Sequence, residues 1–236
     1  MVIDYLGHSG FMAEIPNALL LFDYYRGELS SLLSSKPAGI PLFIFVSHAH
    51  ADHFNPKIFS ISGRPVQYLL SFDLLNSPDV PNGPNVLFLE ADKSYPVDGL
   101  GTVQTLRSTD EGVAFLAETP DGTLFHAGDL HWWDWPGEDP NWLKDQETLF
   151  SREIGRIAGK RIDAAFCVLD DRLEENYAKG LSLFLSVCSP NAVFPMHFWH
   201  DRTVVERFRT LPAVKESGAV IFDTAHENHW ELQERR

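Results

Sequence analysis

Residues 47–54 read SHAHADHF and follow directly on the apolar run PLFIFV at residues 41–46. The three histidines and one aspartate of this stretch cannot all face one way on a strand, because alternate residues of a strand point to opposite sides. The stretch therefore predicts a buried strand that ends in a loop, with the polar side chains gathered around one point. Asn55 and Pro56 then close the loop, as N-cap and first residue of a short helix.

The residue types in this loop indicate a metal site. Imidazole nitrogen and carboxylate oxygen are ligands of zinc-type ions, and catalytic sites use them while leaving a coordination position for water. A chain of this composition would contain the pattern His-x-His-x-Asp-His by chance in on the order of one in a thousand such sequences. We therefore expect four metal ligands in the loop, which are His48, His50, Asp52 and His53.

The motif SHAHADH resembles the signature of the metallo-β-lactamase superfamily, and the similarity extends from about residue 4 to residue 200. YLGHSGF and HAGD look most like the branch of ascorbate-phosphate-lactonase-like hydrolases. The resemblance implies a buried aspartate at Asp23 in LLLFDYY, an aspartate bridging two metal ions at Asp129 in LFHAGD, and the last histidine ligand at His197 in VFPMHFW. It also implies an α/β fold, a four-layer αββα sandwich of two mixed sheets flanked by helices, with the ligand loops along one edge.

One histidine of the family pattern is missing from this chain. Members of the family carry it upstream of the bridging aspartate, where this sequence reads QTLRSTDEGVAFLAE, with Ser108 at about that place. Three alternatives are open: an oxygen ligand, a histidine from another stretch, or a site with a single ion. An oxygen ligand would favour manganese or iron over zinc, because harder ions prefer oxygen. The candidates for an extra ligand, or for a residue that orients the ligands, are His8, Asp110, Glu111 and His131.

A tryptophan-rich stretch, HWWDWPGEDPNW at residues 131–142, follows the Asp129 motif. Aromatic side chains commonly line ligand pockets, and they are also enriched in subunit interfaces. The sequence leaves open whether this stretch forms a pocket wall or the interface of a homo-oligomer. The candidates for a pocket wall are Trp132, Trp133 and Trp199.

The pattern along the chain predicts strands in both halves, with helices added in the second. A hairpin from YLGHSGFMAEI to ALLLFDYY opens the chain, a helix covers residues 27–35, and five short strands form a meander over residues 66–128. Asp170 and Asp171 end a later strand and are expected to serve a cap or turn. The helical predictions are residues 150–157 and 177–188 from their apolar spacing, and a capping box at Thr203 and Glu206.

The composition favours one globular domain over residues 1–236, because 44% of the residues are hydrophobic and are spread along the chain. The 33 acidic and 19 basic residues give a net charge of −14, which would repel the phosphates of a nucleic acid. No apolar run approaches the roughly 18 residues of a membrane helix, and no leader pattern opens the chain. We therefore expect a cytoplasmic protein that binds neither nucleic acid nor membrane.

The sequence is best interpreted as a metal-dependent hydrolase of a small ester, lactone or phosphodiester. One or two divalent ions, zinc before manganese or iron, would lower the pKa of bound water from about 15.7 to about 7 and so provide a hydroxide nucleophile. Asp52 and Asp129 are the residues expected to act in catalysis, and a small molecule is the expected partner. The alternative is a catalytically inactive member of the same fold that binds metal or senses a ligand.

Overall fold

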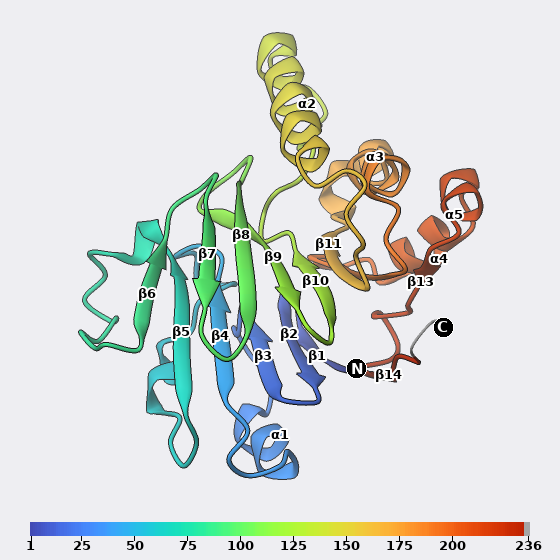
Figure 1. Cartoon of the computed structure of the whole chain (residues 1–236). Helices are drawn as coiled ribbons and strands as arrows, with labels where there is room; N and C mark the ends of the chain where they lie inside the picture. The colour runs from blue at the N-terminus through green and yellow to red at the C-terminus, as the bar shows by residue number, and fades with distance from the viewer. Residues whose placement is uncertain (234–236) are drawn as a thin grey trace.

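Two seven-stranded sheets pack face to face in the computed structural model, which describes residues 1–233 (Figure 1). The first sheet contains, in spatial order, β14 (His229–Glu231), β1 (Val2–Gly7), β2 (Gly10–Ile15), β3 (Ala18–Phe22), β4 (Leu42–Val46), β5 (Val66–Ser71) and β6 (Val86–Leu89). The second contains β13 (Val220–Ile221), β12 (Ala192–Met196), β11 (Ala164–Val168), β10 (Gly122–His126), β9 (Val113–Thr119), β8 (Gly101–Arg107) and β7 (Ser94–Val97).

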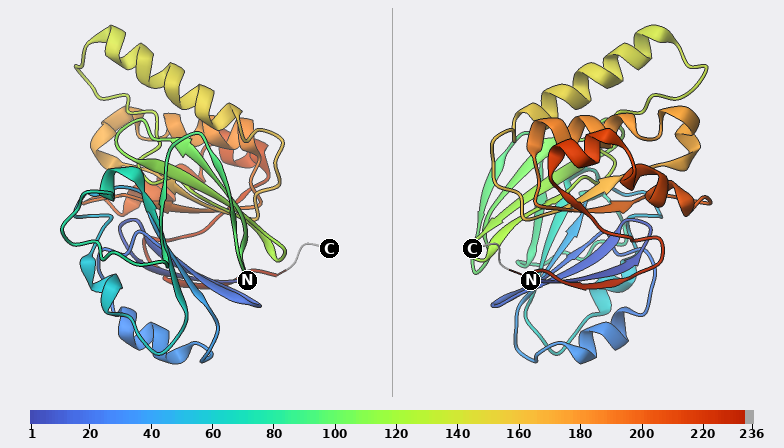
Figure 2. Two further views of the ribbon diagram at one scale, coloured as in Figure 1. Left: turned by 60° about the vertical axis from the view of Figure 1, so that its left-hand side comes forward. Right: turned by 90° about the vertical axis from the view of Figure 1, so that its right-hand side faces the viewer.

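Helices cover the outer surface of each sheet, so the predicted four-layer sandwich is confirmed (Figure 2). The first sheet carries α1 (Leu29–Ser35) and the short 3-10 helices η1 (Pro56–Ser60) and η2 (Phe72–Leu74). The second carries α2 (Pro140–Gly155), η3 (Asp171–Asn176), α3 (Lys179–Cys188), α4 (Thr203–Arg209) and α5 (Pro212–Ser217). Among residues 1–233, none of the helices combines the length and the apolar character needed to cross a membrane.

The strand that precedes the histidine loop, β4, is buried on both faces. It pairs in parallel with β3 and β5, which explains its unbroken apolar sequence. Phe43 and Phe45 point into the core between the two sheets, whereas Ile44 and Val46 join Leu29 of α1 in a second apolar cluster on the outer face. This central position holds the end of β4, and thus the start of the histidine loop, within the packed interior.

The prediction of one meander over residues 66–128 is correct only for its second part. β5 and β6 pair in parallel within the first sheet, and only β7 to β10 form an antiparallel meander in the second. Hydrophobic periodicity identifies strands but not their partners, because both sheets bury apolar faces in one shared core. The edge strands β7, β13 and β14, which are only two to four residues long, are missing from the sequence-based prediction.

Two local predictions at chain turns are also corrected. YLGHSGFMAEI is not one strand but β1 and β2, joined by a tight turn at His8 and Ser9. The capping box of Thr203 and Glu206 does not form, since no side chain caps α4 and the backbone N–H of Thr203 donates to Asp201. By contrast, Asn55 caps η1 as predicted, with its side-chain oxygen accepting from the N–H of Lys57.

Strand direction brings the predicted ligand loops to one edge of the sandwich. In the first sheet β1, β3 and β4 run the same way, since β2 is antiparallel to both β1 and β3. In the second sheet β10, β11 and β12 are parallel. The residues that follow these strands, among them His8, Asp23, Asp129 and His197, therefore lie along the edge where the strands end, as the resemblance implies.

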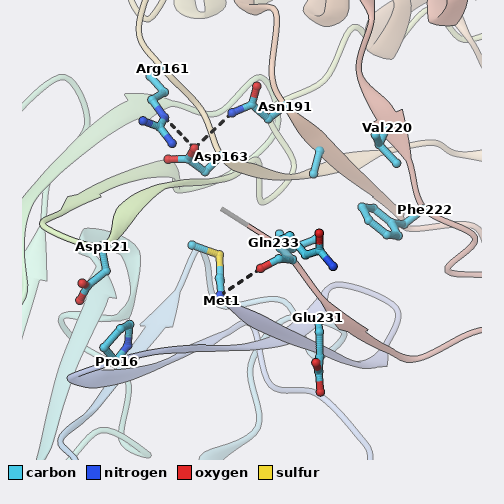
Figure 3. A pocket seen from close by; sticks show the side chains of 12 residues that line it. Met1, Pro16, Asp121, Arg161, Asp163, Asn191, Val220, Phe222, Glu231 and Gln233 are labelled. Carbon is cyan, nitrogen blue, oxygen red and sulfur yellow. Dashed lines mark hydrogen bonds and ion pairs between the residues drawn. The ribbon is translucent and has the colours of Figure 1, made fainter. Parts of the chain in front are cut away.

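A separate cavity of about 250 Å³ lies where the same strands begin (Figure 3). Met1 precedes β1, Asp163 precedes β11, and Val220 starts β13. The polar groups of this cavity bond to one another, because Asp163 accepts from Arg161 at 2.7 Å and from Asn191 at 3.2 Å. Within residues 1–233, no group of three potential metal ligands lies there.

Close backbone contact between the two sheets fixes the histidine loop. A Cβ atom added at Gly112 (φ +69°) would lie 1.9 Å from the carbonyl oxygen of Ser47, and the N–H of Val113 donates to that oxygen at 2.9 Å. Only glycine allows the strand before the loop to approach the turn between β8 and β9 this closely.

We expect Gly112→Ala to destabilise the protein far more than Gly218→Ala. Gly218 has nearly the same backbone conformation (φ +68°) but open space around its Cβ position, so its substitution costs only the conformational strain of about 1–2 kcal/mol. Gly112→Ala adds a backbone clash, for which we expect a further loss of about 1–3 kcal/mol. Urea unfolding of both variants measures the difference, and equal losses would mean that the contact with Ser47 is not a constraint.

Candidate functional site

The carboxylate of Asp23 anchors the histidine loop from inside the fold. It is fully buried and accepts from the N–H of Ser47 at 2.7 Å, from Ser47 Oγ at 2.6 Å and from His53 Nδ1 at 2.7 Å. Burial by itself raises the pKa of Asp23, but the charge of His126 and the charge and hydrogen bond of His53 outweigh it and lower the pKa below its usual value. The anchor is thus an ionised carboxylate at neutral pH.

Hydrogen bonds at Nδ1 orient three of the histidine rings. The ring of His53 donates to Asp23, that of His48 donates to Ser47 Oγ at 2.9 Å, and that of His197 donates to Asp170 at 2.9 Å. When Nδ1 carries the proton, Nε2 presents its lone pair, as in metal-binding histidines whose other nitrogen donates to a carboxylate. All three rings are buried, so these tautomers are set by the protein rather than by solvent.

Three buried polar atoms at the centre of the site have no hydrogen-bond partner among residues 1–233. They are His53 Nε2, His197 Nε2 and Asp129 Oδ1. The two nitrogens lie 3.1 and 3.4 Å from this oxygen without hydrogen-bond geometry. An unpaired buried polar atom is costly. Two imidazoles and a carboxylate that converge in this way therefore fit a divalent metal ion.

The electrostatics of the site also suit a cation. Burial raises the pKa of Asp129, but the charges of His53 and His197 outweigh this and hold it well below its usual value. Burial lowers the pKa of His48 to about 4, with the charge of His53 acting in the same direction. Ligand histidines must be neutral and ligand carboxylates ionised. His48 and Asp129 meet this condition at neutral pH. Burial lowers the pKa of His53, but the charge of Asp129 and the hydrogen bonds with Asp129 and Asp23 outweigh it and raise the pKa well above its usual value, so a metal ion would displace a proton from His53.

The potential ligand atoms fall into three overlapping groups, in each of which all atoms lie within 4.8 Å of one another. The first group brings together His8, Asp52, His53 and His197; the second His48, His53 and Asp129; and the third His50, Asp110 and Asp129. Asp129 belongs to two groups, as expected of a shared ligand. All six residues predicted as ligands from the sequence are therefore brought together at this edge.

Asp110 lies near the place where the resemblance implies a further histidine. This carboxylate joins His50 and Asp129 in one group, and its N–H donates to Ser108 Oγ at 3.2 Å. The loop is tied to the Asp129 loop through Thr109, whose hydroxyl donates to the carbonyl oxygen of His131 at 2.6 Å. Glu111, the other sequence candidate, is exposed, lies 3.6 Å from His50 and belongs to none of the groups formed within residues 1–233.

His8 and His131, the remaining candidates, are placed very differently. His8 Nε2 lies 3.1 Å from Asp52 Oδ2, so the turn between β1 and β2 contributes directly to the site. His131 belongs to none of the groups formed within residues 1–233 and packs against α3, where a Cβ added at Gly180 would lie 2.4 Å from its ring. Burial lowers the pKa of His131 to about 4, so its ring is a neutral core side chain.

Three residues at the site adopt the left-handed backbone conformation that favours glycine. They are His8 (φ 56°), Asp23 (φ 43°) and His197 (φ 69°). This conformation costs free energy in residues other than glycine, and it persists only where contacts with the surrounding structure hold it. Such strained residues are common at functional sites. Each of the three follows a strand directly, so the strain turns its side chain inward from the sheet edge.

A cavity of about 300 Å³ opens above these ligands. Trp133 and Trp199 line it as predicted, whereas Trp132 does not and instead lies under Lys179, whose Nζ is 5.7 Å from its ring. Two further tryptophans, Trp135 and Trp142, also line the cavity. The sequence identified the tryptophan-rich stretch but could not tell which rings turn toward the site, because the stretch from 131 to 139 has no regular periodicity.

Sequence reasoning missed the roles of Asp170 and Arg172. Asp170 caps η3, as expected of a residue at the end of a strand, but it also orients His197 and binds Arg172. Burial raises the pKa of Asp170, yet the hydrogen bonds from His197 and Arg172 outweigh it and lower the pKa to about 2. The only signal in the sequence was an aspartate pair at the end of a buried strand, which is equally typical of a turn.

Comparison with known proteins agrees with this geometry. Residues 2–134 match the model of a family described as beta-lactamase superfamily domain. A UPF0173 metal-dependent hydrolase of Pyrobaculum neutrophilum is 30% identical over 139 residues, which cover 55% of this chain and 61% of that protein. A UPF0173 metal-dependent hydrolase of Opitutus terrae is 26% identical over 215 residues, covering 84% of this chain and 85% of the relative.

The fold is similar to that of Igni18, a metallo hydrolase from the archaeon Ignicoccus hospitalis, with a TM-score of 0.67 and 16% identity over 98% of this chain and 99% of that chain. The match to the Pyrobaculum protein spans about three fifths of that relative's length. The family match covers more than half of the chain and includes the histidine loop, Asp110 and Asp129. The chain therefore belongs to the metallo-β-lactamase superfamily.

Proposed function

We propose that the protein is a metal-dependent hydrolase with two ion positions that share Asp129. The observation that carries this proposal is the convergence of His53 Nε2, His197 Nε2 and Asp129 Oδ1, all buried and all without a hydrogen-bond partner within residues 1–233. His48, His50 and Asp110 would complete the first position, and Asp52, His53 and His197 the second. The names of the UPF0173 relatives, metal-dependent hydrolases, support the same activity.

A bound divalent ion would supply two things here, a lowered pKa for water and polarisation of the attacked carbonyl or phosphoryl oxygen. The protein's own contribution is to hold the ligands rigidly and to leave one side open. His48, His53 and His197 are fixed through their Nδ1 atoms, and the cavity lies above the remaining ligands, which leaves room for a small ester, lactone or phosphodiester.

Asp52 is the residue we assign to proton transfer. Burial raises its pKa, but the hydrogen bond with His8 and the charge of His53 outweigh it and lower the pKa, so the carboxylate is ionised at neutral pH. Its side chain is partly exposed and lines the cavity, where it would accept the proton of the attacking water. His8 and the hydroxyl of Ser9, which donates to the Asp52 carbonyl oxygen at 2.9 Å, fix its position.

The position of Asp110 favours a hydrolase over an inactive, ligand-sensing protein. The sensor alternative rests on the absent histidine, and a carboxylate within reach of His50 and Asp129 compensates for that absence. Partial desolvation together with the charge of Asp129 raises the pKa of the Asp110 carboxyl. A nearby cation would relieve both effects, because it favours the ionised form of each carboxylate.

Hydrolysis and metal dependence test the proposed activity together. We expect the protein, purified without a chelator or a metal-binding tag, to hydrolyse at least one of p-nitrophenyl acetate, an aryl lactone and bis(p-nitrophenyl) phosphate. Chelation should abolish turnover, and zinc, manganese or iron should restore it. Asp129→Ala is the control for background hydrolysis. A folded, ion-loaded protein that exceeds this control with none of the three substrates would overturn the hydrolase assignment.

Metal content tests the ligand assigned to the first position. We expect about two ions per chain by plasma mass spectrometry in the wild type, because the donors form three overlapping groups, two of which share Asp129. Asp110→Ala should lose about one of the two ions, whereas the matched variant Glu111→Ala should retain both. Two ions in Asp110→Ala would show that Asp110 is only a turn residue, and one ion in the wild type would exclude a binuclear site.

A further inference from the structure

The wall of the cavity beside the ligands is aromatic and carries one positive charge. Four tryptophans line it, and Arg172 is the only lining residue within residues 1–233 with a permanent positive charge. The acidic side chains Asp52, Asp110 and Asp129 lie among the ligands. The cavity thus combines metal-binding residues with a cation set among aromatic rings, and the ring centroids of Trp133 and Trp199 lie 5.8 and 5.7 Å from that of His197.

The guanidinium of Arg172 is held in a fixed orientation. Its Nε donates to both oxygens of Asp170, at 2.9 and 3.1 Å, and its Nη2 donates to Oδ2 at 2.6 Å. Its central carbon lies 5.3 Å from the ring centroid of Trp135 and 5.0 Å from that of Trp199, within the range of cation–π interaction. The guanidinium is therefore restrained along one edge by a carboxylate and beside its plane by two aromatic rings.

This arrangement leaves the outer edge of the guanidinium unused. Arginine has five N–H donors, and the pairing with Asp170 uses those on the Nε and Nη2 side. Nη1 has no hydrogen-bond partner within residues 1–233, and 40% of the side chain is exposed. The free Nη1–Nη2 edge has the fork geometry that binds a carboxylate or phosphate through two parallel hydrogen bonds.

Neutralising Asp170 does not require this geometry. His197 and the backbone N–H of Arg172 already donate to the Asp170 carboxylate, and a lysine could balance its charge. The ammonium of a lysine, however, is a compact charge that would not lie against the two tryptophan rings as the planar guanidinium does. It would also lack a second pair of N–H donors, free to bind another group. In a chain with a net charge of −14, a fixed cation inside the cavity is also the feature that would attract an anion locally.

We propose that Arg172 determines substrate specificity, and that the substrate is an oxyanion-bearing ester, lactone or phosphodiester whose carboxylate or phosphate binds the free guanidinium edge. The apolar part of such a substrate packs against the tryptophan wall, while the scissile bond reaches the ligands that line the same cavity. This inference rests on the proposed hydrolase function for the reaction, but the anion site itself is a binding property of the cavity.

Ligand binding tests the anion site without turnover. The tryptophan fluorescence of the metal-loaded protein is titrated with 4-phenylbutyrate and with its neutral amide, 4-phenylbutanamide. We expect the anion to bind about 10- to 100-fold more tightly in the wild type, as for hydrogen bonds to charged groups. Arg172→Gln should remove this difference, and Arg172→Lys should keep part of it. Equal binding of the two ligands to the wild type would overturn the proposal.

Two controls distinguish an anion bound at the Arg172 edge from an anion bound at the metal ions. An anion that binds only to the metal would keep its advantage in Arg172→Gln, and that result would also overturn the proposal. Asp170→Asn keeps the Arg172 charge and one oxygen acceptor for its guanidinium but removes the carboxylate that holds His197, so it should retain at least part of the preference for 4-phenylbutyrate.

The same variants are then compared with mono-p-nitrophenyl glutarate and p-nitrophenyl pentanoate as substrates. Asp170→Asn should lower kcat/KM for both esters alike, by about 10- to 100-fold, as is usual for residues that orient metal ligands. Arg172→Gln should instead reduce the ratio of the two values, glutarate over pentanoate, toward one. An anion preference in binding without hydrolysis of any substrate would leave the Arg172 site standing and would refute the hydrolase function alone.

Discussion

The ionised carboxylate of Asp23, buried between the sheets, is the constraint on which the site depends. A charge in such a place is tolerated only when its oxygens are fully bonded, and Ser47 and His53 provide those bonds from the histidine loop. Any other conformation of the loop would break these bonds and leave the buried charge of Asp23 unpaired, so the cost in free energy holds the loop in place. The bond from His53 Nδ1 to Asp23 also fixes the tautomer of His53. One interaction therefore stabilises the fold and orients a potential metal ligand.

The centre of the site could be predicted from the sequence because its ligands are local. His48, His50, Asp52 and His53 lie within six residues, and only a loop at the end of a strand can gather their side chains. Asp129 and His197 were accessible through resemblance alone, since a single aspartate or histidine after a strand carries no specific signal. Their proximity depends on strand order, which puts the ends of β10 and β12 beside the end of β4 only after both sheets have formed.

The parts that could not be predicted depend on contacts between distant segments. His8 reaches Asp52 across 44 positions of sequence, through a turn with a left-handed residue that no propensity indicates. Asp170 holds His197 across 27 positions, and a capping role described it equally well from sequence. The choice among Asp110, Glu111 and His131 was open for the same reason: residues of two different loops compete for one place, and hydrogen bonds of the Ser108 and Thr109 side chains to the backbone fix how these loops lie.

The approach of Gly112 to Ser47 also limits how this protein can diverge. The loop that carries Asp110 closes on itself through the hydrogen bond from the Ser108 N–H to the Gly112 carbonyl oxygen, and its base rests against the strand before the histidine loop. An insertion or deletion in this loop would break the closure or move the glycine out of contact, whereas exchange of a side chain at its tip would disturb neither. A side chain at the tip of this loop can therefore change by point substitution, at constant loop length, without loss of the contact that holds the histidine loop.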